Sequence, residues 1–182
     1  MGAIKSSLSF DEFERLPDRP GKQELLQGEL IELPPAEFRH NQSSHRILYR
    51  LKAALDAAHA RGEAVELGDA YLEMGYKLAS DSYVQPDVSV THARQAAQKY
   101  LGGSPAIAVE VISPSNSAED LLRKTKVYFQ FGAREVWQFY PNLRAVLVYT
   151  SPAQVSEVGE DDSLTTPLLP GFSLPIRDLL SE

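Results

Sequence analysis

The chain has 182 residues, 43% of them hydrophobic and 24% charged, a composition typical of a soluble globular protein, and we expect one domain over residues 1–182. No apolar run approaches the roughly 20 residues of a transmembrane helix, and no basic stretch leads into an apolar one. We therefore expect a cytoplasmic protein with no membrane partner. The absence of cysteine excludes disulfides and thiolate zinc sites. The net charge of −7 counts against a nucleic-acid partner, because Lys and Arg make most phosphate contacts.

The charge is unevenly distributed along the chain. Acidic residues crowd one late loop, at Glu157, Glu160, Asp161 and Asp162. Basic residues gather elsewhere, at Arg39, His40, His45, Arg46, Arg50 and Lys52, and again at Arg123, Lys124, Lys126 and Arg134. This separation allows a basic surface, and hence a nucleic-acid partner, on an acidic protein.

The N-terminal third predicts a short helix, a hairpin and a long helix. Residues 1–6 also fit the short N-myristoylation pattern, which we interpret as a chance match. Ser9-Phe10-Asp11-Glu12 has the capping-box form that starts a helix. Residues 24–33 read as a hairpin in which Gly28 supplies the positive φ of the turn. From 39 to 61 the apolar residues fall on one helical stripe, which predicts a helix packed on a sheet.

The rest of the chain alternates strand and helix patterns. Strands are predicted at 64–67, 71–78, 83–90, 106–112, 135–139 and 145–149. Helices are predicted at 92–100 and 118–131, with Gly132 ending the second, and a last helical turn at 177–180 follows an extended tail at 168–174. The turn 113–117 leads into the second of these helices. The pattern indicates an α/β fold with a central mixed sheet flanked by helices.

Two carboxylates stand where a core strand should be apolar. Asp87 follows Pro86 in the 83–90 strand, near its middle, and Glu110 interrupts the apolar run 106–112. A buried carboxylate is unfavourable unless a cation or an ion pair compensates it. Since proline breaks strand pairing, Asp87 and the carbonyl of Ile112 can approach one cation together with Glu110. Mg²⁺, with Mn²⁺ as a substitute, takes such hard oxygen ligands.

A lysine follows on the next predicted helix. Lys124 lies in its second turn, within reach of the strand end that carries Glu110. Its ammonium could orient or help to deprotonate an attacking water and offset the charge of a phosphorane. Two acids and a lysine so arranged indicate metal-assisted phosphodiester hydrolysis.

Several fragments, in order along nearly the whole chain, carry a family resemblance. Pro86-Asp87 with Glu110 and Ile112 resembles the PD-(D/E)XK nuclease superfamily, which includes type II restriction enzymes. More narrowly, the chain resembles a bacterial family, abundant in cyanobacteria, of putative restriction endonucleases. The matching pieces are 24–30, Pro34-Pro35 with His40, 85–88, 109–115, Lys124 with Tyr128, 132–137 and 170–172.

The resemblance implies a fold, a reaction and roles for particular residues. It implies a restriction-endonuclease-like fold and Mg²⁺-dependent hydrolysis of DNA. The superfamily's lysine would stand at Ile112, and in the narrower family it appears on the following helix, where Lys124 matches it. The same resemblance implies that Glu24 is a helper carboxylate near the metal and that His40 lies close to the phosphate path. Cutting both strands of a duplex needs two active sites, so we expect a homodimer.

Other interpretations of these residues stay open at the level of sequence. Asp87 can satisfy turn amides, Glu110 can belong to a plain buried ion pair, and Lys124 can pair with Asp120 on the helix surface. Lys126 is a second candidate for the base. For the whole protein, the alternatives are a nuclease-like module that binds nucleic acid or protein without cutting, and a metal-dependent hydrolase of a small phosphorylated molecule.

Overall fold

The computed structural model describes residues 7–114 and 116–180, so the N-terminal myristoylation pattern and Ser115 of the predicted 113–117 turn lie outside the described residues. Its centre is a six-stranded mixed sheet in which β8 and β9 are parallel and the other neighbours are antiparallel. In spatial order its strands are β11 (Gln154–Val158), β10 (Ala145–Ser151), β9 (Glu135–Tyr140), β8 (Ile107–Val111), β6 (Val88–His92) and β3 (Leu67–Leu72).

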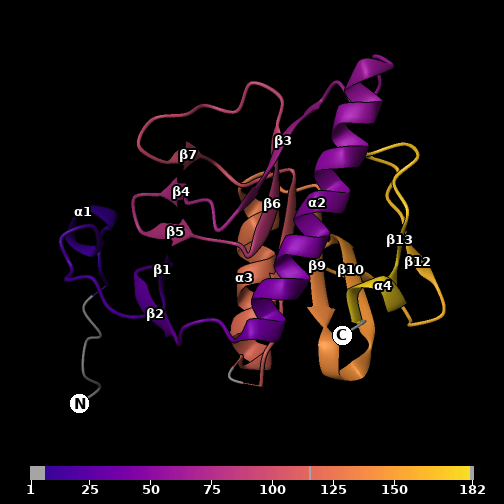
Figure 1. Cartoon of the computed structure of the whole chain (residues 1–182). Helices are drawn as coiled ribbons and strands as arrows, with labels where there is room; N and C mark the ends of the chain where they lie inside the picture. The colour runs from indigo at the N-terminus through magenta and orange to yellow at the C-terminus, as the bar shows by residue number, and fades with distance from the viewer. Residues whose placement is uncertain (1–6, 115, 181–182) are drawn as a thin grey trace.

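Helices cover both faces of this sheet, and a second sheet lies beside it (Figure 1). The helices are α1 (Phe10–Phe13), α2 (Phe38–Ala60), α3 (Ala118–Gln130) and α4 (Ile176–Leu180), with a 3₁₀ turn η1 at Pro141–Leu143. The second sheet has the order β2 (Glu29–Leu33), β1 (Lys22–Leu26), β5 (Ser82–Val84), β4 (Tyr76–Ala79) and β7 (Leu101–Gly102). A small pair, β12 (Ser163–Leu164) and β13 (Leu174–Pro175), precedes α4.

Alternation along the central strands assigns their side chains to two cores. Val109 packs with Leu51 of α2 in the larger core, whereas Ala108 packs with Tyr128 of α3 in the second one. The second core also contains Leu26 and other side chains of the five-stranded sheet. Thus α2 and α3 cover opposite faces, and α3 joins the two sheets.

The α/β class with a central mixed sheet flanked by helices is confirmed, and so are the hairpin and the two main helices. At the hairpin turn both Gln27 and Gly28 have positive φ, as a two-residue turn requires. The capping box of α1 is present: Ser9 Oγ accepts the Glu12 amide, and the Glu12 carboxylate accepts the Ser9 amide. In the part of the chain that the structure describes, none of the helices combines the length and apolarity needed to cross a bilayer.

Three predicted elements in the middle of the chain are wrong. The 92–100 segment is irregular rather than helical, because Arg94 has φ of +60° and the side chain of Gln95 binds the carbonyls of Gly102 and Ser104. The strand predicted at 71–78 is two strands in different sheets, since Glu73 has φ of +44° and turns the chain between them. Residues 64–67 contribute only the first residue of β3.

The strand predicted at 83–90 also divides. It ends as β5 at Val84 and restarts as β6 at Val88, one strand in each sheet. Asp87 therefore lies just before a strand and not near the middle of one. Pro86, which has no N–H for a strand ladder, lies in the break. The structure also contains β11, an edge strand with an exposed polar pattern that the sequence did not indicate.

A buried carboxylate in the larger core gives a prediction about stability. Burial raises the pKa of Glu135, although hydrogen bonds from Thr166 and Trp137 oppose the shift. A carboxyl group whose pKa is raised by folding stabilises the fold fully below its unfolded pKa and less as the pH rises through its folded pKa. In Glu135→Gln the amide oxygen can accept from Trp137 and the amide nitrogen can donate to Thr166 Oγ1, so both contacts can be kept without the charge. We expect its free energy of unfolding in urea to exceed that of wild type at pH 7, with the gap closing at pH 4. A gap that widens on acidification would contradict this.

Candidate functional site

The two acids predicted to share a site do meet across neighbouring strands. β6 and β8 are antiparallel, with Val88 opposite Val109 and Ser89 opposite Ala108. Continuing this register by one residue brings Asp87 opposite Glu110. Both carboxylates belong to the face covered by α3, because strand side chains alternate and Ala108 packs there. Both residues are buried.

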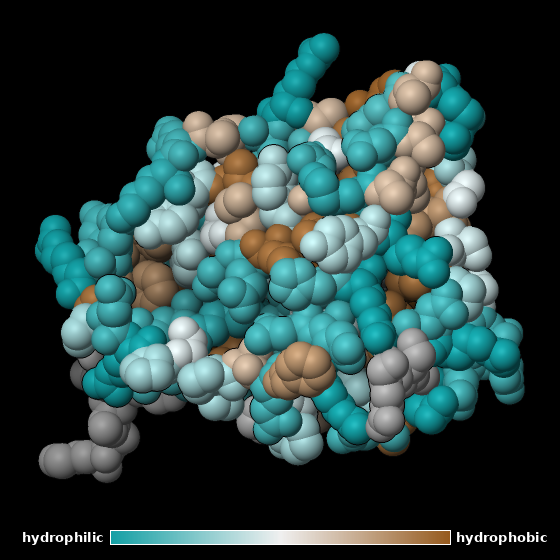
Figure 2. All heavy atoms as spheres, viewed as in Figure 1, coloured by the Kyte–Doolittle hydropathy of each residue, from teal (hydrophilic) through white to brown (hydrophobic). Residues whose placement is uncertain are grey.

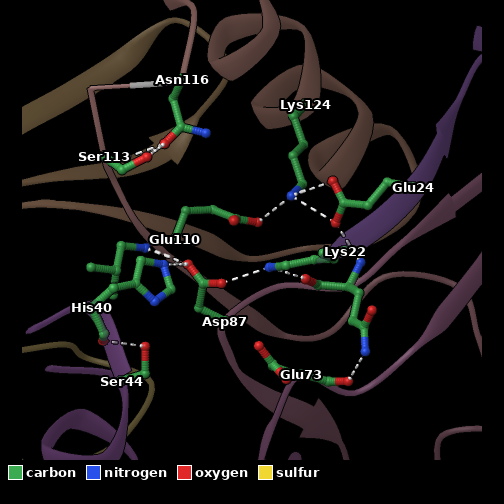
Figure 3. A network of polar contacts seen from close by, with 12 residues as sticks. Lys22, Glu24, His40, Ser44, Glu73, Asp87, Glu110, Ser113, Asn116 and Lys124 are labelled. Atoms are coloured by element: carbon green, nitrogen blue, oxygen red, sulfur yellow. Dashed lines mark hydrogen bonds and ion pairs between the residues drawn. The ribbon is translucent and has the colours of Figure 1, made fainter. Parts of the chain in front are cut away.

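The Asp87 carboxylate is held from three sides (Figure 3). Lys22 Nζ lies 2.6 Å from Oδ1, His40 Nε2 lies 3.1 Å from Oδ2, and the Val111 amide donates to Oδ2 at 2.7 Å. Burial alone would raise the pKa of Asp87, but the hydrogen bond from His40 and the charge of Lys22 outweigh it, so the pKa is lowered. Asp87 is therefore ionised and fixed in orientation.

Glu24 and Glu110 share the ammonium group of Lys124 (Figure 3). Lys124 Nζ lies 2.7 Å from Glu24 Oε2 and 2.9 Å from Glu110 Oε1, and the Gln85 amide donates to Glu24 Oε1 at 2.7 Å. Glu24 and Lys124 are separated by 100 positions in the chain. The cluster thus connects β1, β8 and α3.

The hydroxyl of Tyr128, one turn after Lys124 on α3, donates to Glu110 Oε1 at 2.5 Å. Burial, and next the carboxylate of Glu110, raise the pKa of Tyr128, so the hydroxyl stays a neutral donor. Burial also raises the pKa of Glu110, which Lys124 opposes and Asp87 reinforces. Among the described residues of this cluster, three carboxylates lie beside two ammonium groups, those of Lys22 and Lys124.

Lys124 itself is unsuited to remove a proton. Burial would lower its pKa, but Glu110 and Glu24 more than offset that effect, and the pKa is raised. In this arrangement Lys124 is a cation that donates hydrogen bonds. The raised pKa favours the protonated form of Lys124. The role in orienting or activating water that the sequence predicts for it stays a prediction.

A cavity of about 660 Å³ opens beside the cluster. Its lining joins five regions: the start of β1, the chain between β2 and α2 with the first turn of α2, the turn between β3 and β4, the break between β5 and β6, and the end of β8 with the residues after it. Polar and charged residues dominate the part near the two acids, namely Lys22, Glu37, His40, Asn41, Glu73, Gln85, Asp87, Glu110, Ser113 and Asn116. Such a cavity can receive a polar ligand.

The other predicted residues take distinct places. Ile112 follows β8 and lines the cavity, with its amide donating to the Phe139 carbonyl. Glu24 is 1% exposed and pairs with Lys124, outside the lining of the cavity, and its predicted role as a helper carboxylate near a metal stays a prediction. His40 lines the cavity and orients Asp87, which raises the pKa of His40 while burial of the ring opposes the shift.

The open interpretations of Lys124 are now decided by its position. It does not pair with Asp120, which instead binds Arg123 and the cap residue Ser117. Lys126 is exposed, on the other side of α3. Lys124 is 7% exposed and faces the carboxylates.

Sequence reasoning missed Lys22 and the part played by Tyr128. Lys22 is two residues before Glu24 on the same strand, and alternation therefore points both side chains to one face. Tyr128 is four residues after Lys124, the spacing of neighbours on a helix face. Once Glu24 and Lys124 were identified as candidates, these two spacings could have predicted that Lys22 and Tyr128 lie beside them.

The donor set fits a divalent cation held by two carboxylates. Within residues 7–114 and 116–180, no three His, Cys, Asp or Glu side chains converge as a metal-binding group. Mg²⁺, however, usually takes only one or two carboxylates and keeps several waters. Asp87 and Glu110 supply hard oxygens at the wall of the cavity, with the backbone of Ile112 beside them. The residues present therefore fit such an ion.

Comparison with known proteins defines the family. The model of the Uma2 family, described as "Putative restriction endonuclease", matches residues 10–177, and the chain belongs to this family. No curated protein matches the sequence. The fold is similar to that of a solved structure, a putative nuclease belonging to DUF820 from Anabaena variabilis, with a TM-score of 0.79 over 95% of this chain and 97% of that one. The identity is 19%, so this likeness speaks for the fold alone.

The buried lysine gives a prediction about stability. Lys124→Met leaves two buried carboxylates without their cation, and we expect it to lower the free energy of unfolding by about 3 kcal/mol or more. Urea denaturation measures this. Lys126→Met, an exposed lysine on the same helix, is the matched control and should stay within about 0.5 kcal/mol of wild type. In the double variant Glu24→Gln/Lys124→Met part of the loss should return, and a strictly additive loss would refute the coupling.

Proposed function

We propose that this chain is a single-domain, Mg²⁺-dependent endonuclease that hydrolyses DNA phosphodiester bonds in the cavity beside Asp87 and Glu110. The observation that carries the proposal is the meeting of these two carboxylates, from separate strands, at the wall of a polar cavity with a protonated lysine behind them. Membership of a family of putative restriction endonucleases and the fold of a putative nuclease support a nuclease role.

The proposed mechanism divides the work among the residues of this cluster. Asp87 and Glu110, with the carbonyl of Ile112, would hold the cation, which supplies Lewis-acid polarisation of a phosphate oxygen and a lowered pKa of water. Lys124 and Tyr128 fix the Glu110 carboxylate through two hydrogen-bond donors on one oxygen. His40 and the Val111 amide do the same for Asp87. Because both acids are oriented before substrate arrives, little reorganisation is needed during the reaction.

The positive charge of Lys124 also contributes at a distance. Its ammonium lies behind Glu110, shielded from water, where a charge acts through a lower dielectric than in solvent. It offsets part of the extra negative charge of the phosphorane-like transition state. Glu24 keeps this ammonium in place and keeps it protonated.

The first prediction for this function concerns the two acids. Asp87→Asn and Glu110→Gln should each lower Mg²⁺-dependent plasmid nicking by about 100-fold or more. Each substitution keeps the shape of the side chain and removes the negative charge of a proposed metal ligand. Asp120→Asn, a surface acid of α3, is the matched control and should nick like wild type. If both acid variants still nick the plasmid, Asp87 and Glu110 do not form the active site. If the wild type shifts DNA on a gel yet never nicks it, the chain is a binding module instead.

The exposed face of α2 is the surface that we propose for DNA. Positions four apart lie on one helix face, so Asn41 of the cavity wall continues into His45 and Tyr49, whose rings form a pair 6.2 Å apart. Tyr49 is 67% exposed. Arg39 and Arg50 lie on the same helix, to one side of this row, and Arg50 also pairs with Asp178 at 2.9 Å. α2 runs across the front in Figure 1, and Figure 2 shows that this face is largely hydrophilic with small apolar patches. Basic groups contact phosphates, and aromatic rings can stack on bases. A row of such groups that leads away from the cavity therefore suits a nucleic acid.

This surface can be tested through its salt dependence. The double variant Arg39→Gln/Arg50→Gln should bind a DNA duplex more weakly, and the slope of log affinity against log salt should shrink by about 1 to 2, since each lost phosphate contact removes about 0.9. Arg134→Gln is the control, because Arg134 directly precedes β9, beside the start of β8 and not beside the end that carries Glu110. An unchanged slope would show that DNA does not bind this face of α2.

The expected homodimer has a test of its own. Light scattering of the wild type measures its mass in solution, and the ratio of nicked to linear plasmid shows whether both strands of a duplex are cut together.

A further inference from the structure

Lys22 is a lysine of the candidate site to which the family resemblance assigned no role. It is the first residue of β1, and its side chain is only 14% exposed. Its ammonium lies 2.6 Å from Asp87 Oδ1 and 2.9 Å from the carbonyl oxygen of Gln85. The residue also lines the cavity. A cation therefore already binds two oxygen atoms at the edge of the proposed metal site.

These contacts leave Asp87 fully engaged in the absence of a divalent ion. Its Oδ2 accepts from the Val111 amide and from His40, while its Oδ1 is taken by Lys22 (Figure 3). The Val111 amide belongs to a central strand and cannot withdraw without disrupting β8. Lys22, by contrast, has four flexible side-chain carbons and a cavity to enter. Lys22 is thus the partner on Oδ1, and its ammonium can leave that oxygen while the Val111 amide and His40 still hold Oδ2.

The electrostatics of the cluster point the same way. Asp87, followed by Glu110 and Glu24, attracts the ammonium of Lys22, whereas Lys124 repels it. A divalent ion between Asp87 and Glu110 would feel the same carboxylates and would repel Lys22 at short range. Two cations of which one carries a double charge cannot both stay on a single carboxylate oxygen without a large cost.

We propose that Lys22 is a built-in stand-in for the divalent ion: it neutralises Asp87 while the site holds no ion and yields Oδ1 when one binds. The displaced ammonium then faces the cavity, where it can donate to a phosphate oxygen. This inference rests on the proposed function, because it assumes that Asp87 binds the ion. It makes Lys22 a positioning residue that sets the metal affinity of the site by competing with the metal.

The test measures Mn²⁺ binding by calorimetry on the whole chain, without substrate. Lys22→Met keeps the side-chain length and removes the charge, so Mn²⁺ should bind about tenfold more tightly than to wild type. The same variant should melt at a lower temperature than wild type without metal, since Asp87 loses a partner, and saturating Mn²⁺ should bring the two melting temperatures together. Equal or weaker Mn²⁺ binding by Lys22→Met would overturn the proposal.

Two controls separate competition from other effects. Lys22→Arg keeps the positive charge and should not gain affinity for Mn²⁺. Lys99→Met removes an exposed lysine that pairs with Glu14 away from the cavity, and it should bind Mn²⁺ like wild type. If Lys22→Met does not fold, Lys22→Gln replaces it, and its neutral amide should give the same tightening. A gain shared by Lys22→Arg would also reject the proposal.

The failure of this inference can be told apart from the failure of the proposed function. If wild type binds Mn²⁺ and loses it in Asp87→Asn, the metal site stands, and only the comparison with Lys22→Met decides the role of Lys22. If neither wild type nor Lys22→Met binds Mn²⁺, the metal site and the inference both fall.

Discussion

The ammonium of Lys124, buried between Glu24 and Glu110, is the interaction on which the site depends. A carboxylate on a central strand and another on the neighbouring sheet would each oppose folding if left alone in a poorly hydrated interior. The ammonium of a single lysine on α3 compensates the buried charge of both carboxylates. It also fixes the position of the helix relative to both sheets, so the same ion pairs that permit the buried acids define the geometry of the site.

The break between β5 and β6 has a comparable effect on the backbone. Val84 ends a strand of the five-stranded sheet and Val88 begins one in the six-stranded sheet, so the chain passes from one sheet to the other within a few residues. Asp87 lies where the two sheets meet, and the Gln85 amide and carbonyl contact Glu24 and Lys22. Groups from both sheets thereby converge on one cavity wall, and this arrangement is available only because proline interrupts the ladder there.

In the proposed site the lysine reaches Glu110 from a helix and not from the strand that carries Glu110. Ile112 stands where the PD-(D/E)XK pattern would have a lysine, and it follows β8 and lines the cavity. The cation reaches Glu110 from α3 instead, supported by Tyr128 on the same helix face. Because the ammonium is held by two acids, its raised pKa favours an electrostatic role over proton removal. The net charge of −7 belongs to the whole chain, whereas the carboxylates of the site pair locally with Lys22 and Lys124.

Local patterns sufficed for the hairpin, for α2 and α3, and for the recognition that Glu110 inside an apolar strand needs compensation, because these depend on neighbours within a few residues. They failed at 92–100 and at 71–78, where positive φ and side-chain bonds to distant carbonyls override periodicity. The ion pairs of Lys22 with Asp87, 65 positions apart, and of Lys124 with Glu24, 100 positions apart, were beyond their reach. Only the packing of two sheets around α3 brings these charges together, because the energy that pairs them exists only once the folded chain has removed them from water.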